Sequence, residues 1–269
     1  MKKTIHHLRR IILKSIFLTF FLKIIFSIIN NIKIKKEGRF YLHYLKNIIL
    51  INFHPVFNLD TFYEAFKVFT KHYKAKKGDI ILDVGSGLGS EMVFFSKIIG
   101  SNGKVICIEP DYRLYKVLKK LIKLNKLKNI ILYNNFFYKK NNKKTNFRVN
   151  PIENWMSNNI FNKKNKFENY LSSSITIDKI MKDNNLKKIN YAKFNIEGAE
   201  KYLNKGNNFF LNTCENVTIS CHDFLKSKNT RTFNNLTTLL KNKNFEIINN
   251  DSRHHIYKYI IYAKNRTAK

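Results

Sequence analysis

The strongest constraint on the fold is the run Ile80–Ser90, IILDVGSGLGS, in which a mostly apolar segment ends in three alternating glycines. Such a segment predicts a buried strand that ends in a tight turn, and the pattern after it predicts a helix. Gly85 and Gly87 allow positive φ and let a ligand approach the backbone, whereas Gly89 lets the helix begin close to the strand. The run therefore predicts a nucleotide-like ligand at the end of this strand.

Short apolar runs and helical patterns alternate along the rest of the chain, which predicts an α/β fold with a mostly parallel sheet covered by helices. The runs that predict strands are 80–84, 105–108, 130–133, 191–196 and 217–220, and the helical patterns are 61–75, 91–99, 112–124 and 199–210. A further helix, 232–240, precedes two strands, 245–248 and 256–263. Because only a short turn-like stretch joins these two strands, we expect them to pair antiparallel.

These patterns divide the chain into three parts. Residues 1–35 are basic and apolar, 36–59 form a connecting segment, and 60–269 form the main domain. Within that domain, an insertion at about 139–171 is rich in Asn and Lys and contains the sole tryptophan, Trp155. Its apolar residues predict an irregular but partly buried segment rather than a linker.

The N-terminal part is a candidate membrane helix. Fourteen of the 19 residues from Ile11 to Ile29 are apolar, and basic residues flank the run on both sides. Length alone would allow a span, but Lys14 and Lys23 make insertion nearly neutral in free energy. Polar residues recur every four positions, which favours a helix lying in the membrane interface. The alternative is a helix buried against the main domain.

The formal charge is +32, from 50 Lys plus Arg against 18 Asp plus Glu. Only eight of the basic residues are Arg, the side chain that reads phosphate bidentately, and they do not cluster apart from Arg9 with Arg10. The charge therefore favours a solvated lysine surface, attracted to anionic lipid, over a nucleic-acid interface. The three cysteines form no C-x-x-C pair, which indicates a reducing compartment and a cytoplasmic protein.

Two acidic residues favour S-adenosylmethionine (SAM) over a dinucleotide as the ligand. Asp83 stands two residues before the first glycine, where it would repel a pyrophosphate but attract a cationic amino-acid moiety. Glu109 ends the next strand, 20 residues after Gly89, a position from which a carboxylate binds ribose hydroxyls. The residues predicted to bind the cofactor are Asp83, Gly85, Ser86, Gly87, Gly89 and Glu109.

The chain resembles the FkbM family of SAM-dependent methyltransferases. The resemblance rests on KKGDIILDVGSGLGS, on Glu109-Pro110, on Thr176–Asp178 and above all on KFNIEGAE at Lys193–Glu200. It implies the class I methyltransferase fold, a Rossmann-like sheet of seven mostly parallel strands with one antiparallel strand. It also implies O-methylation of a small molecule or a glycan. The common family form has Asp where this chain has Asn195.

Four polar side chains are expected to converge where the methyl group should point. Asn195 and Glu197 follow the fourth strand, and His222 and Asp223 follow the fifth, so all four reach the ligand-binding edge of the sheet. The predicted catalytic residues are His222, Glu197 and Asn195, with His222 as general base because its ordinary pKa of about 6.5 suits proton removal. Glu197 is the alternative base. No metal is predicted, because adjacent residues such as His222 and Asp223 point to opposite faces.

The sequence thus predicts a cytoplasmic SAM-dependent O-methyltransferase of a small molecule or a glycan, lipid-linked glycans included, associated with an anionic membrane surface through residues 1–35. Two other classes stay open. The charge could serve an RNA methyltransferase, which would lose RNA binding steeply with salt. Alternatively, the chain could be a non-catalytic, membrane-associated basic module on a methyltransferase scaffold, which would not bind SAM.

Overall fold

A computed structural model describes residues 32–53, 59–149, 168–225 and 231–268, together with Phe21, Ile24, Ile25 and Ile28. The predicted helix over 11–29 therefore lies almost entirely outside the described residues. Its four described residues are helical, and each is between 42% and 74% exposed. None of the helices among the described residues is long and apolar enough to cross a membrane.

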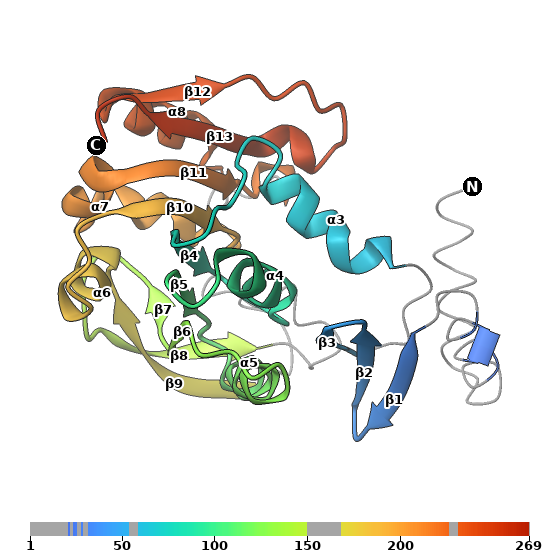
Figure 1. The fold of residues 1–269 in the computed structure, drawn as a ribbon. Coiled ribbons are helices and arrows are strands. Elements are labelled where there is room, and N and C mark those ends of the chain that lie inside the picture. Colours follow the sequence, from blue (N-terminus) through green and yellow to red (C-terminus); the bar gives the residue numbers. More distant parts are fainter. Residues whose placement is uncertain are drawn as a thin grey trace.

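A seven-stranded sheet forms the centre of the molecule (Figure 1). In spatial order its strands are β12 (Phe245–Ile248), β13 (Ile260–Asn265), β11 (Cys214–Ser220), β10 (Ile189–Phe194), β4 (Ile80–Val84), β5 (Lys104–Ile108) and β6 (Ile130–Tyr133). Within this sheet, β13 runs in the direction opposite to that of the other six strands. The structure confirms the expected mostly parallel sheet with one antiparallel strand.

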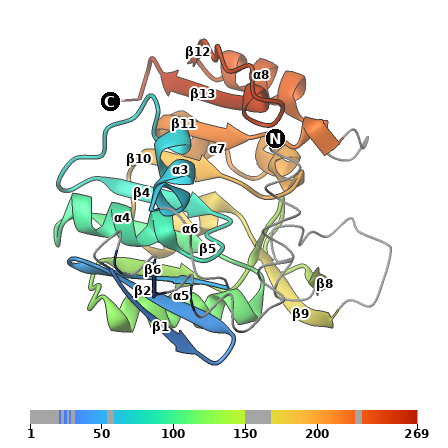
Figure 2. The same ribbon diagram turned by 90° about the vertical axis from the view of Figure 1, so that its right-hand side faces the viewer.

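The central strands are apolar on both sides because each face of the sheet is buried under helices (Figure 2). On one face lie α3 (Asp60–Phe69), α4 (Ser90–Ile99) and α5 (Tyr112–Leu124), whose buried residues share a core with Ile81 and Val105. On the other lie α6 (Ile177–Asp183), the 3-10 helix η2 (Ala199–Asn204), α7 (Asn208–Thr213) and α8 (Phe233–Asn242), which pack against Leu82 and Ile106. Two separate cores therefore hold the sheet in place.

Three predicted elements differ from the structure. The helix expected over 61–75 is α3, which ends at Phe69. The helix expected over 199–210 is η2 followed by α7, because buried Asn207 interrupts it. The Asn207 side chain accepts the backbone N–H of Ile177 and donates to the carbonyl of Lys205, so it takes over hydrogen bonds that a continuous helix would use. The strand expected over 256–263 begins only at Ile260, after the 3-10 turn η5 (Tyr257–Tyr259).

Residues 33–52, part of the predicted connecting segment and its flank, form a separate antiparallel sheet. Its strands are β1 (Lys33–Glu37), β2 (Phe40–Leu45) and β3 (Ile48–Asn52), and its buried Leu42 and Leu50 join the core of α4 and α5. From Ile32 to Lys35, buried Ile alternates with exposed Lys, the pattern of a half-buried strand. A helix-covered sheet and a small antiparallel sheet are thus combined in one packed body.

The predicted insertion is framed by a third sheet. Its strands are β7 (Phe136–Phe137), β9 (Glu168–Ile175) and β8 (Lys144–Val149), in that spatial order. β8 and β9 pair antiparallel over six residues, so both ends of the insertion are regular rather than irregular. Trp155 lies outside the described residues.

Candidate active site

The glycine loop, Gly85 to Gly89, lies where β4 and β10 end. Gly85 has φ +81°, and a Cβ atom at this position would lie 2.2 Å from the backbone oxygen of Asn195. Only glycine fits there, since any side chain would collide with the backbone that follows β10. The N–H of Gly85 donates to the carbonyl of Ile108 at 2.9 Å, so the loop is held between the ends of β10 and β5.

Glu109, at the end of β5, reaches back to this loop. One oxygen accepts the N–H of Gly87 and the other accepts the N–H of Asp111, both at 2.9 Å. The side chain is only 5% exposed, and burial raises the pKa of Glu109 to about 8 even though the two amides lower it. Each carboxylate oxygen keeps a second lone pair that can accept a hydroxyl. The loop and the carboxylate are therefore positioned together before any ligand binds.

Asp83 is fully buried and forms an ion pair with Lys193 on the neighbouring strand. The Nζ atom of Lys193 lies 2.9 Å from Oδ1 of Asp83 and 2.9 Å from the carbonyl oxygen of Gly85. Pairing of β10 with β4 puts Lys193 directly opposite Asp83. Oδ2 of Asp83 is buried and has no hydrogen-bond partner among the described residues, so one acceptor stays available.

A ligand with hydroxyl groups and a cationic amino group fits these residues. Glu109 offers oriented acceptors for the hydroxyls, and the free Oδ2 of Asp83 is an orphaned acceptor that suits an ammonium donor. The Ser86 hydroxyl is already used, because it donates to the backbone oxygen of Asp83 at 3.0 Å. In this structure Ser86 thus supports the loop.

A second cluster stands beside the loop, where Glu197, Glu200 and His222 meet. Nε2 of His222 lies 3.4 Å from Glu197, and Nδ1 lies 3.6 Å from Glu200. The second distance is that of an ion pair rather than a hydrogen bond. The side chains of His222 and Glu200 are buried, whereas that of Glu197 is 22% exposed. Glu197 is therefore the member of this cluster that a substrate can reach.

The charge state of His222 follows from these neighbours. Burial alone would lower its pKa, but the two carboxylates raise the pKa of His222 to about 10. At neutral pH the imidazole is then protonated and has no lone pair with which to accept a proton. The sequence had favoured His222 as general base, and the geometry instead suits a fixed positive charge that orients Glu197.

The backbone of Glu197 supports a special role for this residue. Glu197 has φ +53°, a left-handed conformation that costs free energy for any residue other than glycine. Such conformations are found where the surrounding structure imposes them, often at functional sites. Here the tight turn from β10 into η2 turns the carboxylate of Glu197 toward His222.

The other two predicted members of the cluster lie differently. Asn195 is exposed and follows β10 directly. The Asp223 carboxylate accepts the N–H groups of Thr232 and Phe233 at 2.9 and 3.1 Å, so it caps the start of α8. Within the described ranges, no group of three or more His, Cys, Asp or Glu side chains is arranged to hold a metal ion.

Sequence reasoning overlooked Glu200 as a functional residue. Its carboxylate accepts the N–H of Gly198 at 2.8 Å and the hydroxyl of Thr232 at 2.9 Å, and it faces His222. Glu200 thus connects the turn after β10, the start of α8 and the imidazolium. The available signal was its place in KFNIEGAE, two residues after Gly198, the glycine that precedes η2.

Comparisons with known proteins agree with this architecture. A family model described as the methyltransferase FkbM domain matches residues 83–247. A search of curated proteins found no match to the chain.

The solved structures to which this chain is similar include the following three. A fibrillarin from Methanococcus jannaschii, described as a pre-rRNA processing protein, has a TM-score of 0.47 and 14% identity over 88% of this chain and 99% of its own. A fibrillarin from Aeropyrum pernix with natively bound S-adenosyl-L-methionine has a TM-score of 0.45 and 12% identity over 86% and 97%. A SAM-dependent methyltransferase from Aquifex aeolicus has a TM-score of 0.40 and 14% identity over 77% and 98%.

Proposed function

The chain belongs to the FkbM family of methyltransferases, and from this premise we propose that it transfers a methyl group from SAM to a hydroxyl of a small molecule or a glycan. The observation that carries the proposal is the pairing of two built sites at one sheet edge. The glycine loop with Glu109 and Asp83 suits the donor, and the cluster of Glu197, Glu200 and His222 suits the acceptor.

Several residues of this chain would hold the donor. SAM supplies a methyl group on a positively charged sulfur, so the donor arrives already activated. Glu109 would accept the ribose hydroxyls through its spare lone pairs, and Oδ2 of Asp83 would accept the amino group. The close contact of Gly85 with the backbone of Asn195 keeps side chains out of this space.

Proton removal from the acceptor falls to Glu197. Its carboxylate is the partly exposed member of the cluster, and the protonated His222 beside it fixes its direction. Orientation of this kind matters because methyl transfer is an in-line displacement whose rate depends on alignment. The hydroxyl proton passes to Glu197 as the acceptor oxygen is methylated, while His222 and Glu200 act as positioning residues.

The experiment that tests the proposal uses labelled SAM. Purified protein is incubated with methyl-labelled SAM and fractionated cell extract, and donor binding is measured separately by calorimetry. Glu197→Gln should bind SAM within about two-fold of the wild type and lose about 10²–10⁴-fold in methyl transfer, the size of a general-base contribution. The control Glu246→Gln removes an exposed carboxylate on β12 and should retain both activities.

Three outcomes would count against the proposal. Wild-type turnover in Glu197→Gln would remove Glu197 from proton transfer. Absence of SAM binding in the wild type would contradict the methyltransferase activity itself. Label found in RNA rather than in a small molecule or glycan would contradict the acceptor class.

We also propose that the N-terminal part rests on an anionic membrane surface at the cytoplasmic face. Phe21, Ile24, Ile25 and Ile28 are helical and exposed at spacings that place them on one side of a helix. Basic residues on both sides of this stretch would approach acidic headgroups. A helix of this kind leaves the catalytic domain in the compartment where SAM is available.

The membrane proposal predicts a loss of vesicle binding in a double variant. Full-length protein with Ile24→Asp and Ile28→Asp should bind phosphatidylserine-containing vesicles at least about ten-fold more weakly than the wild type. The reason is that charges replace apolar side chains that the membrane would bury. Leu171→Asp changes a leucine of β9 that is 69% exposed and should have no effect. Cosedimentation measures both, and equal binding of all three proteins would contradict the proposal.

A further inference from the structure

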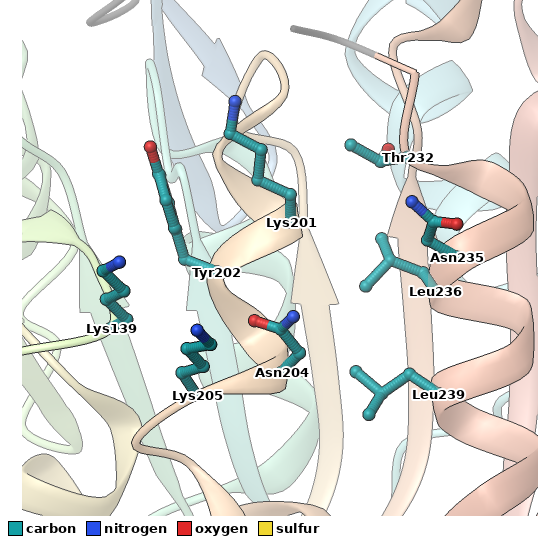
Figure 3. A pocket seen from close by; sticks show the side chains of 9 residues that line it. All are labelled: Lys139, Lys201, Tyr202, Asn204, Lys205, Thr232, Asn235, Leu236 and Leu239. Carbon is teal, nitrogen blue, oxygen red and sulfur yellow. The ribbon is translucent and has the colours of Figure 1, made fainter.

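A pocket of about 300 Å³ lies between η2 and α8, on the sheet face opposite α4. Figure 3 shows Lys139 and Lys205 on one side of η2, and Leu236 and Leu239 extending from α8 on the other. Lys201 and Tyr202 of η2 also line the pocket. Volumes of this size accommodate small ligands such as a monosaccharide derivative.

Lys139 and Lys205 bring positive charge to one side of the pocket. Within the part of the chain that the structure describes, neither Lys139 nor Lys205 has an acidic ion-pair partner. Burial lowers the pKa of Lys201, although nearby Glu200 opposes this change. Lys139 and Lys205, from two segments of the chain, thus line one small pocket. An anion entering it would relieve their mutual repulsion.

The pocket is connected to the candidate acceptor cluster. Thr232 lines the pocket and donates its hydroxyl to Glu200 at 2.9 Å, and Glu200 faces His222. Lys201 and Tyr202 follow Glu200 directly in η2. A molecule in the pocket therefore contacts the same two elements, η2 and the start of α8, that hold the reactive carboxylates in place.

We propose that this pocket binds a phosphate group of the methyl acceptor, so that the substrate is a phosphorylated small molecule or glycan. The inference rests on the proposed methyltransferase function and names the substrate class of that site. Lysine binds phosphate as a point charge, and the two charges of Lys139 and Lys205 suit a dianionic phosphate better than a singly charged carboxylate. Leu236 and Leu239 offer an apolar wall for the carbon skeleton next to the phosphate.

The test measures binding of three matched sugars to the full-length protein by calorimetry at constant ionic strength. The probes are glucose 1-phosphate, glucuronate and glucose, which carry a phosphate, a carboxylate and no charge. The double variant Lys139→Glu/Lys205→Glu reverses two charges of the pocket. The control Lys182→Glu/Lys241→Glu makes the same charge change at exposed helical positions outside it.

We expect the wild type and the control to bind glucose 1-phosphate alike, and the pocket variant to bind it at least about ten-fold more weakly, because two charges that attract the phosphate become charges that repel it. Equal binding by the pocket variant, or no binding by the wild type, overturns the proposal. Glucuronate binding as tightly as glucose 1-phosphate overturns the preference for phosphate. A cooperative thermal unfolding transition in each variant would show that it is folded.

SAM titrations keep the two proposals apart. SAM binds at the glycine loop, so the pocket variant should bind it as the wild type does. If the wild type binds glucose 1-phosphate through the pocket but not SAM, the methyltransferase function fails while the phosphate site stands. If it binds SAM but not the sugar phosphate, only the phosphate site fails.

Discussion

Replacing Asp83 by Leu should lower the free energy of unfolding by about 3–5 kcal/mol, since breaking a buried ion pair leaves the other charge uncompensated. The remaining charge would be that of Lys193, which is 2% exposed and whose other partners are the backbone oxygen of Gly85 and the ring face of Phe69. Burial opposes the charged form of Lys193, yet Asp83 and Glu91 raise its pKa above the ordinary value. Loss of Asp83 removes one of the carboxylates that stabilise the charged form of Lys193.

The double variant Asp83→Leu/Lys193→Met should recover most of the lost stability. Two apolar side chains of similar size can replace a buried ion pair at little cost, because neither charge then needs to leave water. Urea denaturation followed by circular dichroism measures all three proteins. The double variant should nevertheless bind SAM more weakly, because Oδ2 of Asp83 is gone and Lys193 no longer holds Gly85. Stability that stays as low in the double variant as in Asp83→Leu would show that the pair is not the cause.

The parallel sheet could be predicted from the sequence because its determinants are local. Each central strand is an apolar run bounded by polar residues, and the spacing from Ile80 to Glu109 covers one strand, one loop, one helix and the next strand. Such patterns define both the elements and their order. The antiparallel pair β12 and β13 was equally accessible, because only a short segment separates the two strands.

The small sheet of β1–β3 shows where local patterns were insufficient. Its strands have five or six residues, and charged residues interrupt β1, as at Lys35 and Lys36. Only packing of Leu42 and Leu50 against the helices of the main domain makes these strands half-buried. That contact joins residues more than 70 positions apart, as between Ile49 and Asn125, and periodicity carries no information about it.

The candidate site was predictable in its residues but not in their chemistry. The positions of Glu197 and His222 at the ends of β10 and β11 follow from the strands. Whether His222 is neutral depends on two carboxylates that face it, and one of them, Glu200, reaches it only through the turn into η2. A histidine at a strand end suggests a base, whereas a histidine between two carboxylates is a cation.

Glu109→Gln should reduce SAM affinity by at least about 100-fold, because the ionised carboxylate would make two hydrogen bonds to ribose of about 1.5–3 kcal/mol each. The amide keeps the size of the side chain but has one acceptor oxygen, so it cannot accept both Gly87 and Asp111. The N–H left unpaired should loosen the glycine loop as well. Calorimetry with SAM measures the loss, and affinity within a few-fold of the wild type would exclude Glu109 from the donor site.

The pH dependence of binding separates the charge of Glu109 from its shape. Burial raises the pKa of Glu109 from its ordinary 4.5 to about 8, so the free protein at pH 7 holds this group mostly protonated. Its contribution to stability is complete below pH 4.5 and is lost as the pH rises through about 8. Ribose hydroxyls favour the ionised form, so the SAM affinity of the wild type relative to that of Glu109→Gln should increase from pH 6.5 to 9. The comparison cancels the titration of the amino group of SAM, which both proteins share. A ratio of the two affinities that does not change with pH would mean that this carboxyl does not bind the donor as an anion.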